Sequence, residues 1–411
     1  MRLSDESTVG QRIAHHRKRR GMTQEVLCGL VGGKSIEWLR QIESCTRDVD
    51  KLSTIVAVAE ALKIAPSDLL PGPFRSTSSA LTGLGSAPEA VPEIQAAMLR
   101  YDGIAGLLNF PNREVSAQHL KASVERAFVC SQTERWSDMA PLVPNMIEDA
   151  WHLVRNAKAD EERRRAFELQ ALVYRVTSGM LDRLGETQLP WIAAERSMVA
   201  AERSGDPLLI AGGAWRLSVV LRHAGRLTES TDVPVAAADA LRSQLDSPEA
   251  HSVYGSLMLK GAVGAASLGD NASVRDYLAE ASRVADVIGD RNDFWFAFGP
   301  TNVAIHRAWL SLELSDPSKA IDQASVVQHN MLPRELSERR TSHLITVAWA
   351  HYLKRQDREA LAALTEAKAA APEQLLFTRK VHVMLAGMLR RERRSIKSDL
   401  RAMADFVGAV A

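Results

Sequence analysis

The sequence has few cysteines and no long apolar run, and each shortage excludes a class of protein. Its 411 residues include 3 cysteines, Cys28, Cys45 and Cys130, which show neither CxxC nor metal-type spacing, so we expect no disulfide framework and no metal site. No apolar run approaches the roughly 18 residues of a membrane span, and the N-terminus lacks an apolar signal-peptide segment. These absences predict a cytoplasmic protein with no membrane partner.

Catalytic motifs are absent as well. The chain contains no HExxH, GxSxG, dinucleotide fingerprint or carboxylate cluster, and its 11 histidines are scattered. The segment "GLVGGKS" is similar to a phosphate-binding P-loop, but Cys28 stands where that loop requires glycine and no strand precedes it. We therefore expect no enzymatic activity and no cofactor.

Net charge is small but unevenly distributed. The whole chain carries +1, whereas residues 1 to 75 hold 12 Lys or Arg against 9 Asp or Glu, a net charge of +3. Five of these basic residues crowd together in the sequence, and they are Arg12, Arg17, Lys18, Arg19 and Arg20. Such a patch attracts phosphate groups.

Strand signals are almost absent, and apolar residues recur at helical spacing along most of the chain, which predicts an all-α protein. The segment from Pro71 to Pro92 is rich in Pro, Gly, Ser and Thr and has no periodicity, as is typical of a linker. We expect an N-terminal domain at residues 1–72, a linker at 73–92 and a helical body at 93–411.

The helical body repeats. Helices end in a small or polar residue next to a charge at five positions, and they are Gly185, Gly225, Gly269, Ser315 and Gln356. The intervals are 40, 44, 46 and 41 residues, and an Ala-rich helix follows most of these turns. The pattern resembles tetratricopeptide (TPR) hairpins, although its period is longer. That resemblance implies a TPR-like α-solenoid with a concave inner surface; an irregular helical bundle is the alternative.

The N-terminal domain contains short apolar-periodic segments that predict five small helices. Thr23 and Ser35 are placed to cap the second and third helices. We expect Leu27, Leu30 and Val31 on the buried side of the second helix. This arrangement leaves the polar side of the third helix exposed, and a protruding helix of this diameter fits the major groove of B-DNA.

This domain resembles the Cro/C1-type (Xre family) helix-turn-helix, a lambda-repressor-like fold. The matching positions are Arg17 four before Gly21, Thr23-Gln24, Leu27, Leu39-x-x-Ile42-Glu43 and the helix from Leu52 to Leu62. The resemblance implies an ion pair between Arg17 and Glu43. The turn carries one residue more than the family pattern, Ser44 replaces the usual glycine, and Cys28 replaces the usual alanine.

The resemblance also implies a set of side chains that contact double-stranded DNA. They are Gln24, Lys34, Ser35, Ile36, Glu37, Arg40, Gln41 and Arg47. Arginine and glutamine at such positions hydrogen-bond to base edges or phosphates, and a glutamate can accept from a cytosine amino group.

A second group of candidate residues lies in the helical body. Four aromatic residues fall between positions 294 and 298, in a chain that is only 5% aromatic. Together with residues on neighbouring first-of-pair helices they suggest a ligand pocket, for which the candidates are Trp215, Arg222, Tyr254, Phe298, Asn302 and His306. The alternative is that the aromatic residues are ordinary core.

A helix-turn-helix followed by TPR-like repeats is similar to the peptide-sensing regulators of Gram-positive bacteria and to the Xre-TPR regulators of actinobacteria. That likeness implies a transcriptional regulator, a homodimer on a two-fold operator, with a peptide or small-molecule effector in the repeats. The alternative function is a DNA-anchored scaffold whose repeats dock a protein partner.

Overall fold

The computed structural model describes residues 8–20, 22–31, 35–46, 52–62, 69, 87–99, 113–327, 336–391 and 393–409. Within these ranges the regular structure is helical, and the one β-type pairing is an isolated bridge between Arg291 and Phe298. The predicted all-α fold class is confirmed. The chain divides into two compact units, unit 1 (Met1–Thr82) and unit 2 (Gly83–Ala411).

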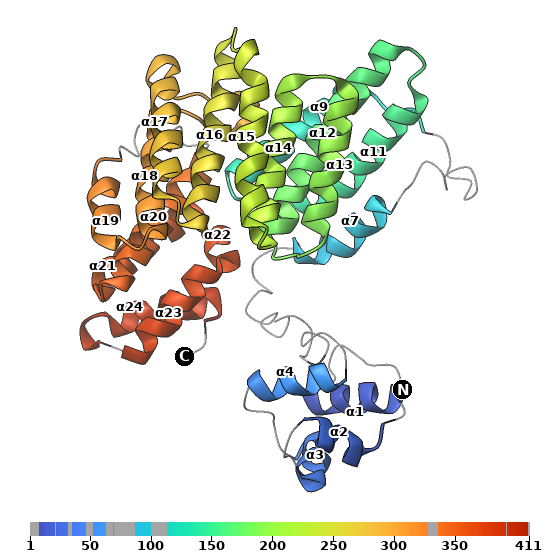
Figure 1. Cartoon of the computed structure of the whole chain (residues 1–411), viewed down its shortest axis with the longest axis vertical. Helices are drawn as coiled ribbons and strands as arrows, with labels where there is room; N and C mark the ends of the chain where they lie inside the picture. The colour runs from blue at the N-terminus through green and yellow to red at the C-terminus, as the bar shows by residue number, and fades with distance from the viewer. Residues whose placement is uncertain are drawn as a thin grey trace. The chain divides into compact units, whose positions relative to one another are not determined.

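Unit 1 is a cluster of short helices (Figure 1). Its described helices are α1 (Val9–Arg19), α2 (Gln24–Leu30), α3 (Ile36–Glu43) and α4 (Leu52–Ala61). The hydroxyl oxygens of Thr8, Thr23 and Ser35 each accept a hydrogen bond from a backbone N–H in the first turn of α1, α2 and α3, so capping determines where these helices begin. The expected fifth helix lies outside the described residues, apart from the buried Leu69.

The core of unit 1 takes one apolar stripe from each helix. Ile13, Leu27 and Leu39 are fully buried in it. Leu30 is not part of that stripe: it is 58% exposed, because Leu27 and Cys28 supply the buried side of the seven-residue α2. The expectation for Leu30 is therefore wrong.

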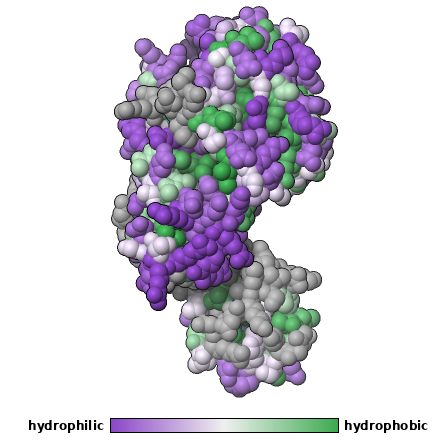
Figure 2. All heavy atoms as spheres, turned by 90° about the vertical axis from the view of Figure 1, so that its left-hand side faces the viewer, coloured by the Kyte–Doolittle hydropathy of each residue, from purple (hydrophilic) through white to green (hydrophobic). Residues whose placement is uncertain are grey.

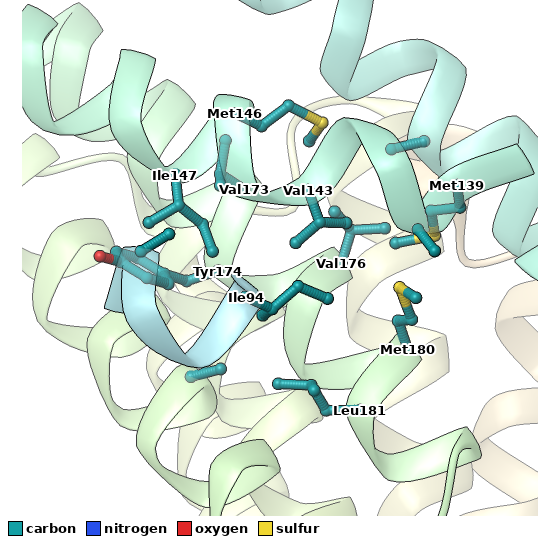
Figure 3. Packing of buried hydrophobic residues seen from close by; sticks show 14 of the residues in the cluster. Ile94, Met139, Val143, Met146, Ile147, Val173, Tyr174, Val176, Met180 and Leu181 are labelled. Atoms are coloured by element: carbon teal, nitrogen blue, oxygen red, sulfur yellow. The ribbon is translucent and has the colours of Figure 1, made fainter. Parts of the chain in front are cut away.

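Unit 2 begins with η2 (Pro88–Ala90) and α7 (Val91–Met98), which start inside the segment 73–92 that the sequence assigns to the linker. Its next described elements are α9 (Ala117–Gln132), α10 (Trp136–Met139), η3 (Ala140–Leu142) and α11 (Val143–Asn156). Ile94 of α7 inserts among Val143 and Ile147 of α11 and Val176 of the following helix (Figure 3), which gives unit 2 an apolar core at this end.

Helical hairpins follow in succession. Their helices are α12 (Asp160–Arg183) with α13 (Leu189–Ser204), α14 (Pro207–His223) with α15 (Leu227–Leu241), α16 (Pro248–Leu268) with α17 (Asn271–Ile288), α18 (Pro300–Glu313) with α19 (Pro317–Ser325), and α20 (Ser337–Leu353) with α21 (Asp357–Ala370). Each of these helices packs on the next, and Figure 1 shows them side by side. The repeat predicted from the sequence is present as a solenoid.

The chain ends with α22 (Pro372–Phe377), α23 (Arg379–Arg391), η8 (Arg394–Ile396) and α24 (Lys397–Val407), and two further 3₁₀ turns, η4 (Arg242–Gln244) and η5 (Asp293–Trp295), interrupt the hairpins. No described helix combines the length and apolar character that a bilayer span requires. Figure 2 shows hydrophilic side chains over much of one face of the helical body, with hydrophobic residues in smaller patches.

The turns within the hairpins have left-handed backbone at Gly185, Gly225, Gly269 and Ser315, as their spacing predicts. In the last hairpin the left-handed residue is Arg355, with φ 58°, and not Gln356. The reason is that α20 ends at Leu353, and the N–H groups of Arg355 and Gln356 bond back to the last helical turn, as at other helix C-termini.

Candidate functional site

In unit 1 the position of α3 depends on an ion pair between Arg17 and Glu43. The Nε and Nη2 atoms of Arg17 donate to the two carboxylate oxygens of Glu43 at 2.6 and 2.7 Å, and Nη1 donates to the carbonyl of Met22 at 2.7 Å. Burial by itself raises the pKa of Glu43, but the hydrogen bonds from Arg17 and Gln24 outweigh it and hold that pKa below its usual range. The pair therefore joins α1 to the C-terminal end of α3 through a charged, largely buried contact.

The exposed side of α3 gathers part of the predicted DNA-contacting set. Ser35, Ile36, Glu37 and Arg40 are all exposed. Arg40 Nη1 donates to Glu37 at 2.7 Å, and Gln41 Nε2 lies 3.4 Å from the other oxygen of the same carboxylate. These side chains form one polar surface that a neighbouring molecule could contact.

Three predicted members of the set, Gln24, Lys34 and Arg47, are not among the exposed side chains described above. Gln24 Nε2 donates to Glu43 at 2.9 Å, so its amide supports the Arg17–Glu43 pair. Lys34 and Arg47 lie outside the described residues. Ser35 has a structural role too, since its hydroxyl caps α3 by accepting from the N–H of Trp38 at 3.1 Å.

Unit 2 contains a cavity of about 500 Å³, within the roughly 300–1,000 Å³ of ligand pockets. Its wall is made mainly by the first helix of each hairpin, α12, α14, α16, α18 and α20, with additions from α9, α22 and α23. The cavity therefore lies on the inner surface of the solenoid.

The aromatic segment crosses this inner surface as a loop, residues 289–299, which we call the inner loop. Its backbone is left-handed at Phe294, Trp295 and Ala297, with φ of 49°, 60° and 50°, an arrangement that costs free energy and needs support from its surroundings. The ring of Trp295 stacks on Phe128 of α9 with centroids 4.1 Å apart, and Arg175 of α12 donates to the carbonyl of Phe294 at 2.8 Å.

Four of the six predicted ligand residues line the cavity: Trp215, Arg222, Asn302 and His306. The other two, Tyr254 and Phe298, do not line it and pack in the apolar core instead.

Neighbouring residues explain why Phe298 and Tyr254 are buried in the core. The ring of Phe298 lies directly over Gly255 of α16, where no side chain competes for the space, and it is 0% exposed. The hydroxyl of Tyr254 donates to Glu280 of α17 at 2.8 Å and accepts from Arg242 at 3.2 Å, so Tyr254 bonds within the hairpin layer.

His306 and Asn302 form a neutral polar pair at the cavity. Nδ1 of His306 lies 2.9 Å from the carbonyl oxygen of Asn302; because a carbonyl only accepts, Nδ1 carries the hydrogen and Nε2 a lone pair. Burial, followed by the charges of Lys260 and Arg339, lowers the pKa of His306 to about 3. His306 is therefore neutral at physiological pH. The side-chain oxygen of Asn302 is buried and has no partner among the described residues.

Arg222 is the one basic side chain of the cavity in the predicted ligand set, and other basic side chains lie there too. Arg175, Arg216, Lys260 and Arg339 all line it. A signal was present: Lys260 is the one Lys or Arg between Arg242 and Arg275, and residues 252–268 around it contain no other charged residue. A lone cation on a helix that is apolar on every side is buried, and buried cations need a partner.

Acidic residues beside the cavity are engaged with these cations. Asp182 contacts Arg216 at 2.8 Å and His223 at 2.7 Å, and these contacts hold its pKa below the usual range although burial opposes them. Glu338 contacts Arg339 at 2.9 Å and Arg183 at 3.4 Å. In the described ranges no three His, Cys, Asp or Glu side chains gather as a metal site would require.

The two ends of the solenoid also meet beside the cavity. A carboxylate oxygen of Glu373 on α22 accepts from the backbone N–H of Trp136 at 2.9 Å and of Ser137 at 3.3 Å. Arg183 of α12 bridges Glu134, which precedes α10, to Glu338 of α20. Burial raises the pKa of Glu134 to about 7 in spite of Arg183. The Glu373 bonds join segments more than 230 residues apart, and all of these contacts border the inner surface.

Comparisons with known proteins add one structure. No protein-family model and no curated protein matches the chain. A search of solved structures found the crystal structure of Bacillus thuringiensis PlcR in complex with the peptide PapR7 and DNA, at 12% identity, covering 85% of this chain and 98% of that chain with a TM-score of 0.38. At this identity and TM-score the likeness is too distant to bear on function.

Proposed function

We propose that this protein is a sequence-specific DNA-binding transcriptional regulator of the cytoplasm, with no enzymatic activity and no cofactor. Unit 1 binds double-stranded DNA through α3, and the cavity of unit 2 binds an effector. Two copies of the chain bind a two-fold operator, because a head of this kind contacts one half-site.

The exposed side of α3 supports this proposal. Ser35 caps the N-terminus of α3, and the ion pair between Arg17 and Glu43 holds its C-terminal end. The polar side chains of α3 therefore lie on a helix of fixed position within unit 1. Arg40 can donate to guanine or phosphate, and Glu37, which orients Arg40, can accept from cytosine. A helix that is held in this way pays less conformational entropy on binding than a loose segment.

The test begins with selection of duplexes from a random library by the full-length protein. Arg40→Ala should then weaken binding to the selected operator by about tenfold or more, as expected for loss of one base or phosphate contact. Arg275→Ala, an exposed arginine of α17, is the matched control because it removes the same charge from unit 2. Equal operator binding by Arg40→Ala and the control would contradict the proposal, as would failure of the protein to select any duplex at modest salt.

The cavity favours an effector over the alternative of a protein-docking scaffold. A protein partner needs an accessible surface, whereas here the inner loop lies over the inner surface and the ends of the solenoid are joined beside it. Thermal-shift screening of peptides and metabolites against the full chain separates the two. A stabilising hit that changes operator affinity supports the effector, and stabilisation only by a protein partner supports the scaffold.

A further inference from the structure

The cavity carries more positive than negative charge. Its lining includes seven Lys or Arg and two acidic residues, Asp182 and Glu338. Both acids are already engaged, Asp182 by Arg216 and Glu338 by Arg339. Since charges inside a protein interact strongly, this excess favours an anion in the space between them.

Lys260 is a cavity cation that several other cations surround. Its Nζ lies 4.2 Å from the centre of the Trp215 ring, and among the described residues no carboxylate pairs with it. The charged and titratable groups around it come from several elements, and they are Arg216 and Arg222 of α14, His306 of α18, and Glu338 and Arg339 of α20. Burial, then Arg339, Arg222 and Arg216, lower the pKa of Lys260 to about 7, so the ammonium is only partly protonated near neutrality.

The same cavity offers unused hydrogen-bonding atoms and flat apolar walls. Asn302 Oδ1, Arg339 Nε and Gln374 Oε1 are buried and have no partner within the described part of the chain. The rings of Trp215 and Phe296 lie 5.3 Å apart, tilted by 51°, and form an aromatic corner. Cations beside aromatic faces are typical of sites for ligands with one charged end and a flat apolar body.

We propose that the cavity binds a small amphipathic anion. Its carboxylate or phosphate lies among Lys260, Arg222 and Arg339. Its flat body lies against Trp215 and Phe296. This inference rests on the proposed function only in calling the anion an effector, because binding itself does not depend on DNA. A small molecule fits better than an extended peptide, since the inner loop occupies part of the inner surface.

The first test uses two fluorescent probes with closely similar ring systems, the anion 1-anilinonaphthalene-8-sulfonate and the neutral N-phenyl-1-naphthylamine. The full-length protein should bind the anion more tightly than the neutral probe. Lys260→Met should weaken binding of the anion by about tenfold or more, the loss expected when one buried charge of a pair is removed, and change the neutral probe little. Lys121→Met, an exposed lysine of α9, is the matched control and should change neither.

Folding of the variant does not confound this test. Lys260→Met removes a partly buried cation that has no carboxylate ion-pair partner among the described residues, so in the absence of ligand its melting temperature should equal or exceed that of the wild type. A Lys260→Met variant that is as stable as the wild type and binds both probes unchanged would overturn the inference. Equal weakening of both probes would overturn it as well, because that result indicates packing and not charge.

The pH dependence gives an independent measurement. Because the anion binds the protonated ammonium, affinity for the sulfonate probe should be highest below about pH 7 and fall as the pH rises above it. Lys260→Arg keeps the charge at every pH, so this fall should disappear while the probe still binds. A fall of equal size in Lys260→Arg would contradict the role of Lys260.

Displacement of the bound sulfonate probe identifies the acidic group. Either 1-naphthaleneacetate or 1-naphthyl phosphate should displace it, and the stronger competitor distinguishes a carboxylate from a phosphate ligand. Displacement by neither would overturn the inference. Operator binding is measured separately: if the anion binds but no duplex is selected, the regulator proposal fails and the anion site remains, and the reverse result removes only the anion site.

Discussion

At the scale of single residues, two cations, Arg17 and Lys260, have opposite surroundings. Arg17 has a bidentate carboxylate partner and a backbone carbonyl, so its burial is compensated. Lys260 is partly buried against an aromatic ring and beside several cations, and the attraction of Glu338 does not offset these effects, so its pKa is lowered. The first arrangement stabilises the fold, whereas the second is typical of a binding site in which a bound anion supplies the opposite charge.

Glu43→Gln tests the compensated pair. It should lower the free energy of unfolding of unit 1 by about 2 kcal/mol at pH 7, the contribution of hydrogen bonds to a charged group. Since the folded pKa of Glu43 is depressed, its contribution is present above the ordinary glutamate pKa of about 4.3 and is lost as the pH falls through the folded value. The variant should therefore lose less stability than the wild type on acidification from pH 5.

Urea unfolding of the full chain, labelled with 5-fluorotryptophan and followed by ¹⁹F NMR, isolates this unit because Trp38 is its one tryptophan. Glu25→Gln, an exposed carboxylate in the first turn of α2, is the control. If the acid dependence of Glu43→Gln equals that of the control, the ion pair does not stabilise unit 1.

At the scale of elements, small residues determine how closely helices and loops approach. Gly10 of α1 lies where a β-carbon would overlap the carbonyl oxygen of Ile42 on α3. Backbone atoms cannot move aside as a flexible side chain can, so the crossing of α1 and α3 requires glycine at this position. The inner loop, in contrast, is held by side-chain amides: Gln132 of α9 and Asn292 exchange hydrogen bonds of 2.8 and 3.0 Å.

Gly10→Ala should destabilise unit 1 by about 3 kcal/mol or more, because the added methyl group must push α1 away from α3. The matched control is Gly29→Ala on α2, where nothing lies within 4 Å of the new carbon, and alanine there should stabilise the helix by about 0.5–1 kcal/mol. The same ¹⁹F signal of Trp38 measures both. Equal effects of the two substitutions would show that the crossing tolerates a side chain.

Gln132→Ala should loosen the inner loop without unfolding unit 2. The substitution removes both amide contacts to Asn292 and a bond to the carbonyl of Trp295, so backbone amides of residues 291–298 should exchange with deuterium roughly five- to tenfold faster. Exchange mass spectrometry of the full chain detects this change, and Gln118→Ala, exposed on the same helix, serves as control. Unchanged exchange in the loop would mean that other contacts hold it, such as the stacking of Trp295 on Phe128 and the bond from Arg175 to the carbonyl of Phe294.

At the scale of the whole chain, the curvature of unit 2 matters most. Hairpins that stack with a small rotation bring distant segments together, and here Glu373 of α22 accepts two backbone N–H bonds from the start of α10. The result is an inner surface that holds a cavity and is bordered by contacts between the two ends of the solenoid. A ligand that passes this border depends on the stability of these contacts.

Glu373→Ala should speed the release of a ligand from the cavity. Loss of two charge-assisted bonds lowers the cost of opening by about 1.5–3 kcal/mol, so the sulfonate probe should leave the cavity about tenfold faster in stopped-flow displacement. Glu359→Ala, exposed in the first turn of α21, is the control. A release rate equal to that of the control would indicate that the ligand enters by another route.

The sequence by itself determined the helices, their caps and their repeat. These depend on neighbours three or four residues away, so Thr23 and Ser35 could be assigned as caps and four of the five hairpin turns could be placed by residue. Aromatic spacing also pointed to the wall of the cavity, where Trp215, Asn302 and His306 lie.

Only the tertiary structure decided which side of each helix meets which partner. Phe298 is core and Trp295 crosses the inner surface, although both belong to one aromatic run, because Gly255 of a different hairpin accommodates one ring and Phe128 of α9 stacks on the other. The positive charge of the cavity also depends on the tertiary structure. Lys260 and Arg339 are 79 positions apart in the sequence, and their mutual repulsion exists only because the solenoid curves and brings their helices to one cavity.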